Sequence, residues 1–402
     1  MTDTTTTDTT THTNHIDYQT DQYLVRRYVS RILTRFHRFR DNARWTELRT
    51  GEVFGSPLMG LPGQIGHRCR VLWHGGLESE DVPQLRQMFQ KMLDDQERQP
   101  CPEGMIQRNL RALARELKLP DAELELLTFL LAIELYEPLK DLIGALDLAP
   151  SEKTLLIAAA TGVSLDDVQN LLSDGSPLLE AELLVTNGGG HGGRPDVELT
   201  GQLARTITQP HAEPGDVLSW AISRDRHPAL PLSAFDHLKP WHEVAWRCLK
   251  AADLQGRGLN VLLHGPGGAG KTALARCLAR TAQLELCLHP QNGRPNRWSD
   301  TEFARAFAVL RRRGHGALLV DPGFISLGRK PGVGQLDLLD LMEHPGVQVL
   351  WTSPSLDEIH PNLLHRFDLV LALPEPPEPW TRPVWEDLLT PDDRTKLGMG
   401  LP

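Results

Sequence analysis

The chain has 402 residues, of which 40% are hydrophobic and 23% charged, enough to build cores in two or three domains. Its net charge of −10 argues against a protein whose whole surface coats nucleic acid or membrane. It has no run of eighteen apolar residues and no signal-peptide pattern after Met1, so we expect a cytoplasmic protein without a transmembrane segment. The five cysteines show no C-x-x-C spacing and the sixteen histidines no zinc-ligand spacing, which favours reduced thiols and no zinc site.

Residues 1–20 form a Thr-rich tail that we expect to be disordered, because it has almost no apolar surface to bury. Residues 21–118 are predicted to be mainly helical, and residues 23–45 place apolar side chains at helical spacing. From Arg26 to Arg49 this region has eight arginines against Asp41 and Glu47, a net charge of 8 − 2 = +6. Two interpretations stay open. In the first, the basic helix docks nucleic acid, an acidic partner protein or a membrane surface. In the second, the helix packs against the rest of its own chain, which is acidic.

Residues 119–208 are predicted to form a winged-helix-like module. Residues 151–173 have the pattern of a helix-turn-helix, and two short apolar stretches flank a glycine-rich loop at residues 187–196 that resembles a wing. The second helix carries Asp166 and Asp167 but no Lys or Arg, and only Arg194 is basic in the loop. Because acidic residues repel phosphates, a structural or protein-docking module is favoured over DNA recognition.

Residues 209–234 resemble a linker, and residues 235–377 a nucleotide-binding domain. Residues 261–272 read VLLHGPGGAGKT, a short apolar strand followed by a complete G-x-x-x-x-G-K-[ST] motif, and residues 273–283 continue with helical periodicity. Glycines let the backbone approach phosphate oxygens, and the N–H groups of the loop and helix N-terminus then face the anion. The predicted phosphate-binding residues are Gly265, Pro266, Gly267, Gly268, Ala269, Gly270, Lys271, Thr272 and Ala273. A glycine-rich turn with an accidental Lys-Thr is the alternative.

Further strands follow this motif in alternation with helices, which predicts an α/β sheet. Residues 284–288 are the second strand, and residues 316–321 are a third that ends at Asp321. An acid in that place is typical of a Mg²⁺-side carboxylate. The fourth strand, at residues 347–352, ends with Thr352 and Ser353, and the fifth spans residues 369–373.

Residues 235–377 resemble the ATPase domain of bacterial AAA+ proteins in these motifs. The resemblance implies a three-layer P-loop NTPase fold with a parallel sheet in the order 5-1-4-3-2, preceded here by the mainly helical region. It implies ATP as ligand, with Lys271 at the β- and γ-phosphates and with Mg²⁺ held by Thr272 and Asp321. Thr352 and Ser353 match the sensor 1 place. Arg366, in the segment HRFD, matches an arginine finger that reaches a neighbour's nucleotide in a ring, for example a hexamer.

Two departures from the AAA+ pattern divide the predicted function. Pro322 stands after Asp321, where these ATPases usually have a water-orienting Glu, and residues 378–402 form a tail too short for a four-helix lid. One hypothesis is an ATPase that is slow alone or completed by a partner. A substitute acid for it would come from Glu302, Asp337, Asp340 or Glu343. The others are an ATP-binding scaffold without hydrolysis and a winged-helix DNA-binding regulator.

Overall fold

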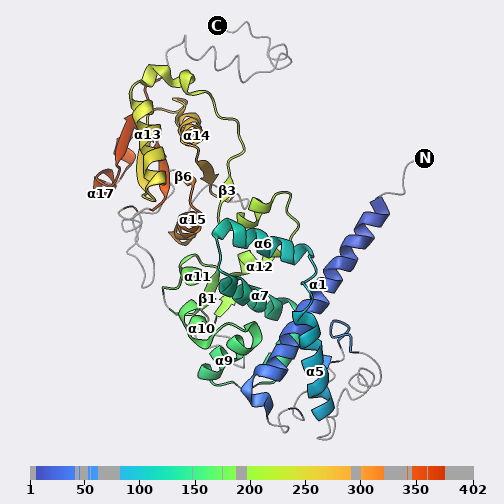
Figure 1. The fold of residues 1–402 in the computed structure, drawn as a ribbon. Coiled ribbons are helices and arrows are strands. Elements are labelled where there is room, and N and C mark those ends of the chain that lie inside the picture. Colours follow the sequence, from blue (N-terminus) through green and yellow to red (C-terminus); the bar gives the residue numbers. More distant parts are fainter. Residues whose placement is uncertain are drawn as a thin grey trace, which may run out of the picture. The chain divides into compact units, whose positions relative to one another are not determined.

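The computed structural model describes residues 6–40, 45, 53–54, 56–61, 82–146, 148–173, 175–186, 197–290, 300–320, 342, 346–359 and 361–375. The chain divides into two compact units, Met1–Val217 and Leu218–Pro402, and each is described by itself (Figure 1). Among the described residues no helix is both long and apolar enough to cross a membrane.

The first unit is built on a long helix, α1 (Thr6–Arg35), which continues into a short 3-10 helix, η1 (His37–Arg40). Its buried side chains follow the helical period and include Leu24, Tyr28 and Ile32. They pack mainly against three helices: α5 (Val82–Glu97), α8 (Glu137–Gly144) and α9 (Pro150–Thr161). The helix includes Thr-rich residues that the sequence assigned to a disordered tail. Helix propagation from a packed stretch adds one hydrogen bond per residue, which is how a polar N-terminal extension can continue a helix.

A largely apolar helix, α7 (Asp121–Leu135), contacts α6 (Met105–Leu117), α8 and α9 in the same unit. Gly162 takes a left-handed conformation (φ 77°) that ends α9, and the Ser164 hydroxyl caps α10 (Leu165–Leu171). A short helix, α11 (Pro177–Glu180), then leads to a two-stranded antiparallel ribbon of β1 (Leu184–Thr186) and β2 (Val197–Leu199). The helix α12 (Gly201–Ile207) follows, and a 3-10 turn, η2 (Pro214–Leu218), reaches the end of the unit. The predicted wing loop, with Arg194, lies outside the described residues.

The second unit contains a six-stranded, mostly parallel sheet in the order β3-β5-β6-β7-β4-β8. Its strands are β3 (Ser223–Arg224), β4 (Leu259–His264), β5 (Glu285–Leu288), β6 (Gly316–Val320), β7 (Gln348–Ser353) and β8 (Leu369–Ala372). The main helices are α13 (Trp241–Leu254), α14 (Lys271–Thr281) and α15 (Asp300–Arg313). Shorter helical turns are η3 (Leu232–Leu238), η5 (Leu356–Glu358) and α17 (Pro361–Leu364).

The two strands β4 and β7 lie in the interior of this sheet and read as continuous apolar runs because both of their faces are covered. Val261 and Leu263 pack into a core that α13 and α14 share. Trp351 is fully buried on β7, and its indole N–H donates to Asn260 Oδ1 at 3.1 Å. The loop that leaves β4 therefore starts from the buried centre of the sheet.

The predicted five-stranded parallel P-loop sheet of AAA+ type is not what the structure contains. The sheet is mixed and has a sixth strand, β3, which pairs antiparallel with β5 at the edge. This strand comes from residues that the sequence assigned to a linker. The physical reason is that β5 would otherwise leave its outer N–H and C=O groups unpaired, and two residues of an extended segment are enough to cover part of that edge.

Candidate functional site

The loop of residues 265–270 leaves the C-terminal end of β4 and leads directly into α14. Since β4 lies between β7 and β8, the loop sits within the carboxyl edge of the parallel strands. Gly268 and Gly270 both have φ near 84°, which favours glycine. A Cβ added at Gly265 would lie 2.1 Å from the carbonyl oxygen of Leu373, the residue after β8. The backbone conformation of the loop therefore requires glycine at position 265 and favours it at positions 268 and 270.

The structure gives this loop the features of an anion site. Lys271 is the first residue of α14, and its Nζ donates to the carbonyl oxygens of Gly265 at 2.7 Å and Pro266 at 2.8 Å. Within the described part of the chain no carboxylate pairs with this ammonium group. Gly270, the N-cap, gives α14 no side-chain cap, so the first N–H groups of an eleven-residue helix stay available. Among the described residues, a Cβ added at Gly267 or Gly268 would meet no atom within 4 Å.

Thr352 and Ser353 lie beside the start of this loop, as neighbours of β4. In the parallel register Thr352 pairs with Leu263 and Ser353 with His264, and the Gly265 N–H donates to the Ser353 carbonyl oxygen at 3.1 Å. The Ser353 hydroxyl is buried and donates to the Ser355 carbonyl oxygen at 2.7 Å. Of the two predicted polar residues, Ser353 thus shapes the turn, while the Thr352 hydroxyl has no such bond to the turn.

Arg366 is not brought to the loop of its own chain. It precedes β8, and its N–H donates to the Leu363 carbonyl oxygen at 2.9 Å. Asp368, two residues later, bonds the backbone N–H of Asn260 at the opposite end of β4. From Asn260 to His264 the strand rises about 13 Å, so Arg366 lies at the other edge of the sheet.

Several predicted residues lie outside the described part of the chain. They are Asp321, Pro322, three of the candidate substitute acids and the whole C-terminal tail of residues 378–402. The fourth candidate acid, Glu302, is on α15, where its Oε2 is 3.7 Å from His289 Nε2. Among the described residues, no group of three or more His, Cys, Asp or Glu side chains is arranged to hold a metal ion.

The sequence did not indicate an ion pair between Asp225, the residue after β3, and Arg276 on α14, the helix that begins at Lys271. The side chain of Asp225 is almost fully buried and accepts a hydrogen bond at 2.6 Å from Nε of Arg276, on α14. It also accepts from the backbone N–H of His227 at 3.0 Å. Burial disfavours its charge, but the hydrogen bonds from Arg276 and His227 outweigh this and lower the pKa of Asp225. The partners are 51 residues apart, and no local pattern signals such a pair.

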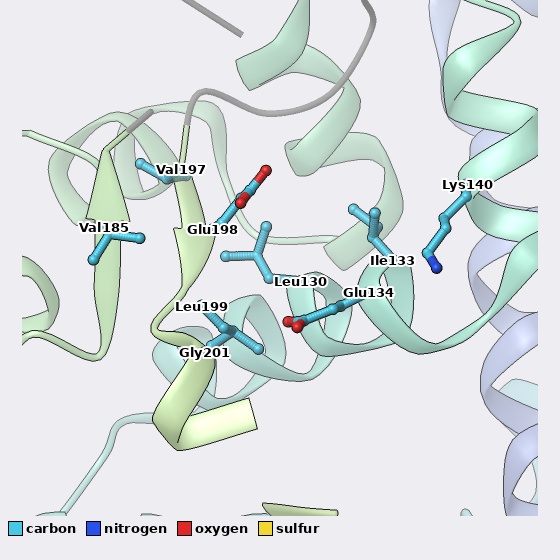
Figure 2. A pocket seen from close by; sticks show the side chains of 9 residues that line it. All are labelled: Leu130, Ile133, Glu134, Lys140, Val185, Val197, Glu198, Leu199 and Gly201. Carbon is cyan, nitrogen blue, oxygen red and sulfur yellow. The ribbon is translucent and has the colours of Figure 1, made fainter. Parts of the chain in front are cut away.

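A cavity of about 440 Å³ lies in the first unit, between β2 and α7 (Figure 2). Its lining is apolar apart from three charged side chains, Glu134, Lys140 and Glu198. No sequence pattern indicated it, because its lining residues come from two segments, residues 130–140 and residues 185–201, that only the fold brings together.

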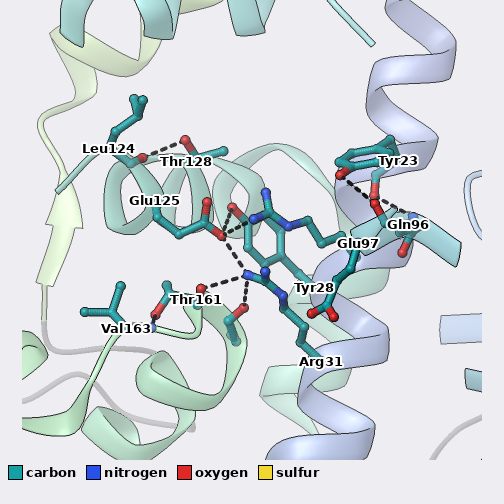
Figure 3. Close-up of polar contacts among 12 residues, drawn as sticks. Tyr23, Tyr28, Arg31, Gln96, Glu97, Leu124, Glu125, Thr128, Thr161 and Val163 are labelled. Carbon is teal, nitrogen blue, oxygen red and sulfur yellow. Dashed lines mark hydrogen bonds and ion pairs between the residues drawn. The ribbon is translucent and has the colours of Figure 1, made fainter. Parts of the chain in front are cut away.

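Five arginines of the basic segment, between Arg26 and Arg38, bond groups of the first unit, and Figure 3 shows the contacts of Arg31. Arg31 is 8% exposed and donates to Glu125 Oε1 at 2.8 Å and to the carbonyl oxygens of Ala160 and Thr161. Arg27 also pairs with Glu125, and other arginines of the segment bond groups of the same unit: Arg26 to Met59, Arg35 to Glu97, Arg38 to Glu152. These contacts match the alternative in which the helix packs on its own acidic protein.

Comparison with known proteins assigns this chain to no family. The chain matches no protein-family profile and no curated protein. Functional inference therefore depends on the residues and their geometry.

Proposed function

We propose that the second unit binds ATP on residues 265–272, and that the chain hydrolyses ATP slowly or only with a partner. The observation that carries this proposal is the glycine loop between β4 and α14, with Lys271 free of carboxylates within the described residues and the first turn of α14 uncapped. In this proposal Lys271 holds the β- and γ-phosphates. Thr272, which is exposed at the second position of α14, shares Mg²⁺ with Asp321.

Slow hydrolysis follows from the residue after Asp321. Pro322 has no carboxylate, and the loss of a general base or water-orienting group costs roughly 10²–10⁴-fold in rate. Binding survives such a loss because the loop and Lys271 provide it. An ATP-binding scaffold without hydrolysis is the second candidate function. It is supported by the same observation, that Pro322 and not an acidic residue follows Asp321.

Self-association is a further part of the proposal. The position of Arg366 at the far edge of the sheet supports a role on a neighbouring copy, in a cytoplasmic ring such as a hexamer. The mass measured by light scattering with a non-hydrolysable ATP analogue should then exceed that of a monomer, and Arg366→Ala should lower the ATPase rate without weakening ATP binding. A strictly monomeric mass with analogue bound would remove this role for Arg366.

Partner and nucleic-acid contacts through the predicted surfaces have less support. Five of the arginines proposed to dock a partner, Arg26 to Arg38, are bonded inside the first unit. Replacing Arg31 would disturb that unit whether or not a partner exists. The acidic first turn of α10, with Asp166 and Asp167, disfavours DNA. A protein partner is therefore proposed without assigning it to the basic segment.

The test pairs calorimetry with steady-state phosphate release on one preparation. Lys271→Ala should abolish ATP binding, whereas Lys91→Ala, which removes an exposed lysine of α5, should leave it unchanged. Binding with Lys271-dependent phosphate release supports an ATPase, and binding without release supports the scaffold. Equal ATP affinity in the unsubstituted chain and in Lys271→Ala would refute the proposed site.

A further inference from the structure

The cavity of about 440 Å³ in the first unit runs along the outer edge of β2 (Figure 2). All three residues of that strand, Val197, Glu198 and Leu199, line it, whereas β1 contributes only Val185. Successive side chains of a strand point to opposite faces, so a cavity that touches all three lies at the strand's edge. The opposite wall is α7, through Leu130, Ile133 and Glu134.

The backbone of β2 presents hydrogen-bonding groups to this cavity. Thr200 N–H donates to the Leu183 carbonyl oxygen at 3.2 Å, which makes these two residues a hydrogen-bonded pair of the ribbon. Such pairs alternate with pairs that are not bonded to each other, so Glu198 belongs to the next bonded pair. Val197 and Leu199 therefore direct their N–H and C=O groups away from β1. Within the described residues, β2 pairs with β1 alone.

The charges of the cavity are not balanced within the described residues. The ammonium group of Lys140 bonds Glu137 Oε1 at 3.2 Å, while neither Glu134 nor Glu198 has a hydrogen bond or ion pair there. Burial, followed by the negative charge of Glu198, raises the pKa of Glu134, and Lys140 opposes this. A cation placed near both carboxylates would relieve their repulsion.

We propose that the outer edge of β2 is a docking site for an extended segment of a partner protein that carries a lysine or arginine side chain. The segment adds to the ribbon as a third strand, and its backbone bonds Val197 and Leu199. Its alternate side chains face two surfaces: apolar ones contact Leu130 and Ile133, and the basic one lies near Glu134 and Glu198. A free small cation would satisfy the carboxylates but not the backbone groups, and a nucleic acid would be repelled by them.

The test begins with a display library of random seven-residue peptides selected on the immobilised full chain, with counter-selection on the double variant Glu134→Lys, Glu198→Lys. Selected peptides should alternate β-branched or aromatic residues with Lys or Arg. In fluorescence anisotropy, the double variant Glu134→Gln, Glu198→Gln should bind a labelled selected peptide at least tenfold more weakly. Glu180→Gln, which changes an exposed carboxylate of α11 outside the cavity, should not alter the affinity.

Two further measurements separate strand addition from simple charge attraction. Methylation of alternate backbone nitrogens in the peptide should abolish binding, because it removes the donors that a new strand needs. In the unsubstituted chain, bound peptide should slow hydrogen exchange of the Val197 and Leu199 amides at least tenfold. The proposal is overturned by no enrichment above counter-selection, by enrichment of acidic peptides, by equal binding of the methylated peptide or by unchanged exchange. Competition by free arginine at the peptide's own concentration would overturn it in favour of a small-cation site.

Discussion

Replacing Asp225 tests whether the β3 segment is anchored to the helix of the candidate phosphate site. The Asp225 side chain is 2% exposed and that of Arg276 is 24% exposed. Breaking a buried ion pair by removing one partner costs about 3–5 kcal/mol. Because a quarter of the Arg276 side chain stays in contact with water, the lower end of this range applies. We expect Asp225→Ala to lower the free energy of unfolding of the second unit by about 3 kcal/mol.

Asp225→Asn should cost less, about 1.5 kcal/mol, because the amide oxygen can still accept one hydrogen bond while the charge is lost. The two variants also differ from the unsubstituted chain in acid. The folded-state pKa of Asp225 lies below the ordinary value of 3.8. Its contribution to stability is therefore complete above that value and is lost as the pH falls through the folded-state pKa. Neither variant should show this part of the acid dependence.

Urea unfolding followed by tryptophan fluorescence is a suitable assay, because only Trp45 and Trp73 of the nine tryptophans precede the second unit. Asp253→Ala is the matched control: it removes a carboxylate of the same unit whose partner, His315, is largely exposed, and should cost less than about 1 kcal/mol. If Asp225→Ala costs no more than this control, β3 is not anchored through Arg276. A double-mutant cycle with Arg276→Ala should show that the two effects are not additive.

Two other predictions concern the loop and the first unit. Gly265→Ala should unfold or rearrange the β4 loop and lower the thermal unfolding midpoint, because its Cβ would lie 2.1 Å from the Leu373 carbonyl oxygen. Gly267→Ala should keep the midpoint, because its Cβ would meet no described atom within 4 Å. Equal midpoints for the two variants would contradict the close approach of Leu373 to this loop. Glu152, which accepts two hydrogen bonds from Arg38, has a pKa of about 2, so the stability it provides is present above its ordinary value of 4.5 and lost as the pH falls toward 2. Glu152→Gln should flatten the acid dependence of unfolding between those values, as measured by circular dichroism, and an unchanged pH profile would contradict this reading.

Much of the secondary structure of the second unit can be predicted locally. The apolar run of residues 261–263 and the glycines after it indicate a buried strand and a turn that needs φ > 0, and the structure has β4 and a loop with φ near 84° at Gly268 and Gly270. The same pattern placed Thr352 and Ser353 at the tip of a strand, where the structure has the end of β7. In each of these cases the information lies within a few residues, as a hydrophobic period or a backbone requirement of glycine.

Long-range pairing is where prediction was wrong or left open. The sheet has a sixth, antiparallel strand because residues assigned to a linker reach the edge of β5, a pairing that a two-residue strand does not signal. Arg31 and Arg38 of the basic segment pair with Glu125 and Glu152 of their own chain, which lie more than ninety residues away in the sequence. Without these partners the sequence could not show whether the arginines face a partner protein or their own chain. A charge run has the same appearance in the sequence in both cases, since only the fold determines which carboxylates it meets.

By itself, the sequence determined the strand–loop–helix order around Lys271, the acidic balance of the chain and the residue types that an anion site requires. Only the tertiary structure determined that Arg366 lies at the opposite edge of the sheet from this loop and that Asp225 bonds Arg276. It also determined that β2 has one edge without a pairing strand among the described residues, beside two carboxylates. The physical reason is the range of the interactions. Backbone conformation and hydrophobic period act between near neighbours, whereas ion pairs, sheet edges and cavities are formed by residues that the folded chain brings together.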